Sequence, residues 1–96
     1  HMPKARNASE VRRFVDIPNI GPAMADDFRL LGVVAPSDLA RRDPMDLYRS
    51  LCEATGTRQD PCVLDTFLAA CDFMSGAPAR PWWHYTASRK ERWPNV

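Results

Sequence analysis

Prolines mark the starts of helices in this sequence, and their positions restrict the fold more than any other feature. Pro44 and Pro61 each follow an aspartate. An Asp-Pro pair is a strong start signal, because the aspartate caps the helix and the proline fits its first position. Pro22, which follows Gly21, is equally well placed at a first helical position. We therefore predict three helices, which run from Pro22 to Leu31, from Pro44 to about Ala54 and from Pro61 to about Ser75.

The helix expected after Pro61 is apolar on nearly all of its surface, which is typical of a helix at the centre of a domain. Shorter helical segments are expected from Asn7 or Ser9 to Val15, from Pro36 to Arg41, and from Thr86 or Ser88 to Arg92. No window alternates apolar and polar residues as a half-buried strand would. The sequence therefore predicts an all-α fold of about five helices, in which residues 9–31 and 44–75 could form a degenerate tandem pair of units, each made of two helices joined by a hairpin or turn.

Length and composition favour a single folded domain. A chain of 96 residues, 45% of them apolar, can bury one modest core. We assign residues 9–93 to this domain, residues 94–96 to a tail, and residues 1–8 to a cloning scar at His1 and Met2 followed by a flexible basic segment. No signal peptide and no apolar run of membrane-spanning length is present, so we expect a cytoplasmic protein without membrane contact.

Charge is unevenly distributed along the chain. The formal net charge is only +1, yet residues 3–13 carry four basic side chains and one acidic one, and residues 80–96 carry the same numbers. Residues 14–79 hold five arginines and ten acidic residues. If a nucleic acid is the partner, attraction to its phosphates must therefore come largely from the two ends of the chain.

The stretch IPNIG, from Ile17 to Gly21, is the strongest candidate for a binding site. Pro18 fixes φ, Asn19 tolerates a positive φ, and Gly21 permits close approach of a ligand to the backbone. A helix follows at once, and its first N–H groups have no partner within the helix. We expect the N–H groups of Ile20, Gly21 and the first helical turn to point outward together, which suits an anion such as a nucleic-acid phosphate.

These residues resemble a known motif and a known family. IPNIGPAMADDFRLLG is similar to the helix-hairpin-helix motif, whose usual form is an apolar-Pro-Gly-Ile-Gly hairpin followed by Pro, a basic residue, a small residue and Ala. Together with the two Asp-Pro helix starts and the WWH segment, it resembles the small bacterial pathogenicity-locus proteins, also called mitomycin-resistance-like. The resemblance implies a compact all-α helix-hairpin-helix domain that contacts a DNA backbone through hairpin amides, without reading sequence.

Two departures from the motif weaken the expected contact. Asn19 replaces the first glycine, which is tolerable because asparagine visits the left-handed region. Ala23 stands where DNA-binding members usually have a basic residue, and Asp26 and Asp27 follow one turn later. Each lost phosphate contact lowers affinity, so we expect weak binding. The candidate contact residues are Ile17, Asn19, Ile20, Gly21 and Ala23, with Arg12 and Arg13 as replacement cations.

The aromatic segment near the C-terminus has two interpretations. Trp82 and Trp83, with Arg89 and Lys90 as basic neighbours, could form a platform on which unpaired bases stack. Alternatively, at least one tryptophan covers the small core, because a domain of this size needs its large aromatic side chains for burial. We favour core cover for at least one of these two tryptophans.

Catalytic and metal sites are not expected. The sequence has no phosphate-binding glycine loop, no zinc-protease motif and no plausible triad, and we predict a protein that is not an enzyme and needs no cofactor or small-molecule substrate. The three cysteines, Cys52, Cys62 and Cys71, lack zinc-ligand spacing and are predicted to be buried reduced thiols. Two functions stay open: a weak, non-specific DNA-binding module, and a protein-interaction or self-associating module whose hairpin is purely structural.

Overall fold

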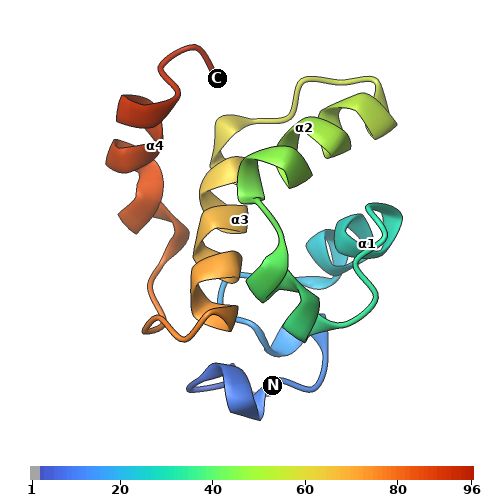
Figure 1. The fold of residues 1–96 in the computed structure, drawn as a ribbon, viewed down its shortest axis with the longest axis vertical. Coiled ribbons are helices and arrows are strands. Elements are labelled where there is room, and N and C mark those ends of the chain that lie inside the picture. Colours follow the sequence, from blue (N-terminus) through green and yellow to red (C-terminus); the bar gives the residue numbers. More distant parts are fainter. Residues whose placement is uncertain (1–2) are drawn as a thin grey trace.

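The computed structural model describes residues 3–96, and His1 and Met2, assigned to the cloning scar, lie outside the described residues. Within residues 3–96 all regular elements are helical, which confirms the predicted all-α class (Figure 1). Four are α-helices and four are short 3-10 helices, labelled η. In chain order they are η1 (Ala8–Glu10), η2 (Phe14–Asp16), α1 (Pro22–Leu30), η3 (Pro36–Arg41), α2 (Pro44–Thr55), α3 (Pro61–Met74), η4 (Trp82–Tyr85) and α4 (Thr86–Arg92).

Helix α3 forms the centre of the fold, as its composition predicts. Nine of its 14 residues are buried, and it contacts α2, η3, η4 and α4. Figure 1 shows α4 on one side of α3 and the α1 and α2 helices on the other. The ring of Phe28 in α1 lies 5.2 Å from that of Phe67 in α3 and 5.4 Å from that of Phe14 in η2, measured between centroids. These aromatic contacts fix the segment before α1 to the central helix.

The starts of α2 and α3 are capped as the Asp-Pro pairs predict. Oδ1 of Asp43 accepts the N–H of Met45 at 2.9 Å, and Oδ1 of Asp60 accepts the N–H of Cys62 at 2.8 Å. Each aspartate thereby satisfies one of the N–H groups that a helix start leaves without an intrahelical partner. Both helices are therefore closed at their N-termini by their own side chains.

The segment before the hairpin differs from the expected single helix. Residues 9–15 fold as parts of two separate 3-10 helices, η1 and η2, joined by extended backbone. Asn7 caps η1 as predicted, since its Oδ1 accepts the N–H of Ser9 at 3.1 Å. The carboxylate of Asp16 accepts the N–H groups of Arg12 and Arg13 at 3.0 and 2.8 Å. Side-chain oxygens thus take backbone donors that a continuous α-helix would need, and the segment turns instead.

A buried ion pair attaches α4 to α3. Asp65 is fully buried and accepts two hydrogen bonds from Arg89, at 2.9 and 3.2 Å. Neither of the two expected caps, Thr86 and Ser88, caps the last helix: both lie inside α4, and the N-cap residue Tyr85 makes no side-chain cap bond. The hydroxyl of Thr86 instead donates to Asp65 at 2.8 Å. The hydrogen bonds from Arg89 to α3 therefore determine how α4 is placed.

The three cysteines are free thiols, and one of them is buried in the core. Cys71 is buried, and burial raises the pKa of its thiol to about 12, while Cys52 and Cys62 are only half-buried. The prediction of a buried thiol is thus confirmed for Cys71 alone. In the part of the chain described here, no three acidic, histidine or cysteine side chains gather as a metal site, and no helix is long and apolar enough to cross a membrane.

Candidate functional site

The IPNIG hairpin is a tight turn whose apolar residues anchor it in the core. The carbonyl of Ile17 accepts the N–H of Ile20 at 3.1 Å, with Pro18 and Asn19 between them and Asn19 at a φ of 74°. This is the pattern of a type II turn. The side chains of Ile17 and Ile20 have no exposed surface. Because the turn uses the N–H of Ile20, that amide cannot also bind an anion, and the expectation that it would do so is wrong.

Open backbone donors begin one residue later. Among residues 3–96, the N–H groups of Gly21, Ala23 and Met24 make no hydrogen bond, and the first intrahelical bond of α1 runs from Ala25 to the carbonyl of Gly21 at 3.0 Å. Gly21 and Ala23 are both exposed. No side chain caps this helix. The hairpin therefore presents three free donors at the positive end of a helix dipole.

Gly21 differs from the three other glycines of the chain. Those three have positive φ angles, which strain any residue with a side chain: Gly32 at 81°, Gly56 at 64° and Gly76 at 106°. Gly21 has a φ of −98°, which every residue adopts, and a Cβ built on it would meet no atom within 4 Å. Neither backbone conformation nor packing thus requires glycine at this position. Its effect is to leave the neighbouring amides uncovered.

Lys4 places a positive charge beside the hairpin. Its Nζ donates to the carbonyls of Val15 and Ile20, each at 2.6 Å, and the N–H of Ala5 donates to the carbonyl of Asp16 at 2.8 Å. An ammonium group has three protons, so one remains for a further acceptor. Lys4 is therefore a basic side chain in contact with the hairpin, although Ala23 is not basic. It also holds the described part of residues 1–8 against the domain, where the sequence predicts a flexible segment.

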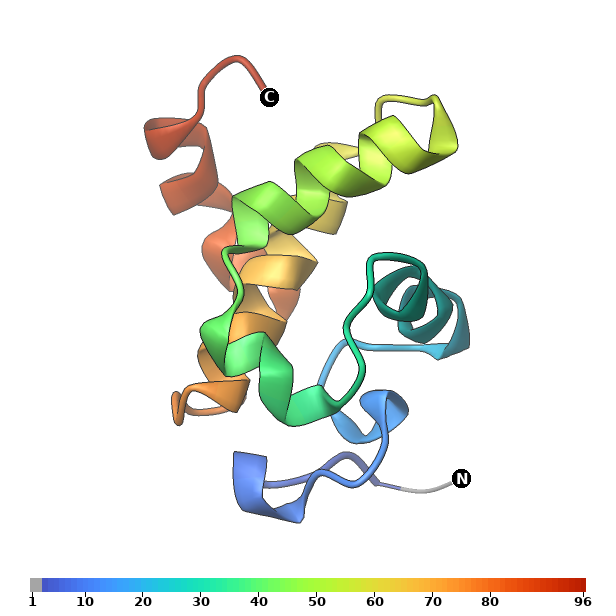
Figure 2. The same cartoon turned by 45° about the vertical axis from the view of Figure 1, so that its right-hand side comes forward.

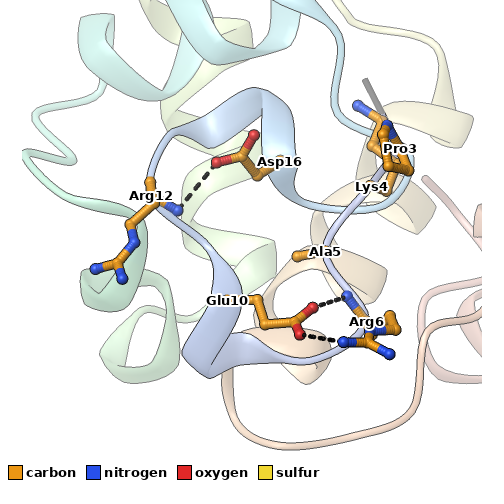
Figure 3. A pocket seen from close by; sticks show the side chains of 7 residues that line it. All are labelled: Pro3, Lys4, Ala5, Arg6, Glu10, Arg12 and Asp16. Carbon is orange, nitrogen blue, oxygen red and sulfur yellow. Dashed lines mark hydrogen bonds and ion pairs between the residues drawn. The ribbon is translucent and has the colours of Figure 1, made fainter. Parts of the chain in front are cut away.

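A shallow surface pocket of about 370 Å³ adjoins Lys4 (Figure 3). Glu10 pairs with Arg6 at 3.0 Å, and Asp16 pairs with Arg13 at 3.3 Å. The guanidinium of Arg12 has no ion pair within residues 3–96, and Figure 3 shows it pointing away from both carboxylates. The pocket is lined by Pro3, Lys4, Ala5, Arg6, Glu10, Arg12 and Asp16. Its acids are already partnered, so the pocket adds free positive charge through Arg12.

The acidic flank of the hairpin is partly neutralised. Asp26 forms an ion pair with Arg29 at 3.0 Å, and both side chains are exposed. Asp27 is half-buried in the same helix, and burial, followed by the nearby charge of Asp26, raises the pKa of its carboxyl group. Within residues 3–96 Asp27 has no ion-pair partner, so its carboxyl group, when ionised, weakens any anion contact at the start of this helix.

The side chain of Asn19 connects the hairpin to the segment before η4. Its Nδ2 donates to the carbonyl of Arg80 at 2.8 Å, and its Oδ1 accepts the N–H of Trp82 at 3.3 Å. Glycine could supply the positive φ at this position but neither hydrogen bond, which explains why asparagine is found here. Trp82 and Trp83 are edge-to-face, with ring centroids 5.6 Å apart. The aromatic segment therefore begins beside the tip of the hairpin.

The two other expected basic auxiliaries do not join this surface. Arg89 is only 8% exposed and its guanidinium is bound to Asp65, so it is not available to a ligand and its predicted role is wrong. Lys90 is exposed on the C-terminal half of α4. Figures 1 and 2 both show this end of α4 at the opposite end of the molecule from the N-terminal segment. Of the two basic ends of the chain, the N-terminal one gathers at the hairpin.

Fold and surface together define a small all-α domain in which a hairpin with free backbone donors lies beside basic side chains. A model of the family described as Pathogenicity locus matches residues 7–91, and the chain belongs to this family. Mitomycin resistance protein McrB of Streptomyces lavendulae is 47% identical over 72 residues, which cover 75% of this chain and 69% of the relative. No solved structure matches the chain.

Proposed function

We propose that this protein is a non-catalytic helix-hairpin-helix module that holds a DNA backbone weakly, without reading sequence, in the cytoplasm. One observation carries the proposal. Gly21 is a glycine that the fold itself does not require, and it leaves the start of α1 uncapped, while the ammonium of Lys4 is held on the carbonyl of the preceding residue, Ile20. Backbone N–H groups at a helix start, with a cation next to them, form a suitable environment for a phosphate.

Contacts to phosphate oxygens alone would make the binding independent of DNA sequence. Amide and ammonium donors to phosphate oxygens fix position but carry no information about base sequence. Few cations are free at this surface, since Arg6, Arg13 and Arg29 are already paired with acids. Each phosphate contact contributes about −0.9 to the slope of log affinity against log salt concentration. A site with two free cations, Lys4 and Arg12, would therefore bind weakly and with a shallow salt slope.

A protein-interaction module remains the alternative function. The exposed apolar side chains of Leu30 and Val34, 60% and 87% accessible, lie just after the acidic pair of α1 and would suit a partner with apolar and basic groups. Self-association through the same residues is a second form of this alternative. In both forms the hairpin serves only to connect η2 to α1.

A DNA titration tests the proposal. We expect a fluorescent blunt duplex to bind at low salt and to dissociate at moderate salt, as measured by anisotropy. Lys4→Gln and Arg12→Gln should each weaken binding several-fold and reduce the salt slope by about one unit. Lys90→Gln is the matched control, because it removes the same charge at the far end of α4, and it should change little.

Two results would contradict the proposal. One is the absence of duplex binding at low salt by the folded wild-type protein. The other is an equal loss of affinity in all three variants, because that would indicate attraction to overall charge and no defined site. Circular dichroism of each variant checks that loss of the Lys4 contacts to Val15 and Ile20 has not changed the fold.

A further inference from the structure

Trp83 is a large aromatic side chain that the core does not use. It is 64% exposed, and neither Trp82 nor Trp83 is among the side chains that pack against the core, so the expectation that one of this pair covers the core is wrong. Trp93 packs against the core instead. Leaving an indole in water forgoes the burial that a small domain needs. The neighbouring Trp82 contacts the Trp83 ring edge-to-face at 5.6 Å, which restricts its orientation. An exposed indole held in this way is suited to stacking.

The position of Trp83 relates it to the hairpin. Asn19 binds the backbone on both sides of Pro81 through its bonds to Arg80 and Trp82, so η4 begins at the hairpin tip. Trp83 is the next residue along. The side chain of Arg80 is exposed in the same connector, and its positive charge lies near the hydroxyl of Tyr85 in η4. The backbone just before Trp83 is thus bound to the hairpin tip, and the exposed indole follows it directly in the chain.

We propose that Trp83 stacks on an unpaired base, so that the preferred ligand is DNA with a single-stranded segment next to a duplex. This inference rests on the proposed contact between the hairpin and a DNA backbone. Every base offers a flat face, and stacking on an aromatic side chain is therefore tolerant of sequence. The positive charge of Arg80 and the amides of α1 select a polyanion over an apolar partner for this ring.

The experiment compares two DNA ligands that differ only in one feature. A blunt duplex and the same duplex with a short thymine overhang are titrated at low salt, with anisotropy of the labelled DNA and quenching of tryptophan fluorescence as readouts. We expect the wild-type protein to bind the overhang about tenfold more tightly than the blunt duplex, the order expected for one stacked base.

Variants of Trp83 separate stacking from other causes. Trp83→Ala should abolish the preference for the overhang and leave affinity for the blunt duplex unchanged, while Trp83→Phe, which keeps a flat ring, should retain most of the preference. Val34→Ala, at another exposed apolar position, is the control and should change neither affinity. Because Trp83 is exposed, we expect the thermal midpoint of Trp83→Ala to stay close to that of the wild type.

The outcomes distinguish this inference from the proposed function. Equal wild-type affinity for both ligands, or a preference that survives Trp83→Ala, would overturn the stacking role while leaving backbone contact intact. Absence of binding to either ligand would overturn both. A Trp83→Ala variant that loses blunt-duplex affinity in the same proportion would also contradict stacking on an unpaired base.

Discussion

Helices α1 and α3 both begin with a proline, yet their N-termini are handled in opposite ways. Asp60 closes α3 by accepting the N–H of Cys62, and the body of α3 is bound to α4 through Asp65. Gly21 leaves α1 open, with Lys4 held nearby on the carbonyl of Ile20. At α3 the polar side chains bind one another or the backbone, and they stabilise the fold. At α1 the first N–H groups have no hydrogen-bond partner within residues 3–96, and we therefore assign the binding surface to this helix start.

Breaking the ion pair on α3 should have the largest effect. Asp65→Ala leaves the buried guanidinium of Arg89 without its partner, and we expect a loss of about 3–5 kcal/mol in the free energy of unfolding. Urea denaturation measures this loss. The double variant Asp65→Leu/Arg89→Met should recover much of it, because removing both charges leaves no unpaired ion. A single-variant cost below about 1 kcal/mol, the median for surface pairs, would show that the pair is solvated.

The two helix starts should respond oppositely to changes of the capping residue. Asp60→Ala removes a cap and should lower stability by about 1 kcal/mol. Gly21→Ser adds one at a backbone conformation that serine adopts freely, and it should raise stability by about 0.5–1 kcal/mol, partly by restricting the unfolded chain. Thermal and urea unfolding of both variants measure the difference. Destabilisation by Gly21→Ser would show that the fold itself needs glycine at this position.

Two aspartates near the hairpin should give small pH effects of opposite sign. Hydrogen bonds from the N–H groups of Arg13 and Arg12 lower the pKa of Asp16 below 3.8, so its contribution to stability is present above that pH and is lost as pH falls through the lowered pKa. Burial raises the pKa of Asp27, so its ionised form costs stability, and this cost disappears as pH falls through the raised pKa.

Amide variants test this difference. Asp16→Asn should lower the melting temperature at pH 7, and Asp27→Asn should raise it. Both differences should shrink in acid, where the wild-type carboxyl groups become protonated. Calorimetry at pH 7 and in acid measures the shifts. A change of the same sign for both variants at pH 7 would contradict the environments described for the two carboxyl groups.

Local signals were sufficient to predict most of the helices. The starts at Pro22, Pro44 and Pro61 match the structure, because proline and its capping neighbour act within a few residues. The segment from residue 9 to 15 could not be predicted in the same way. It is divided because the side-chain oxygens of Asn7 and Asp16 accept backbone N–H groups, which competes with the helical pattern.

The candidate site was only partly predictable, because it depends on contacts between distant residues. The turn at Asn19 and the open amide of Gly21 follow from their residue types. Lys4 contacts carbonyls 11 and 16 residues away, and no local pattern indicates this. Arg89 looks like a surface cation in sequence, yet its partner Asp65 lies 24 residues earlier and removes it from the surface.

The most direct test of the account places a cap on the open helix. Gly21→Asp puts a carboxylate where we propose that a phosphate binds, in space that a side chain can occupy. Ala87→Asp adds the same charge at an exposed position on α4 and serves as the control. Blunt-duplex titration at low salt should show binding by wild type and Ala87→Asp, and at least a tenfold weaker affinity for folded Gly21→Asp. Equal affinities of the two variants would contradict binding at the hairpin.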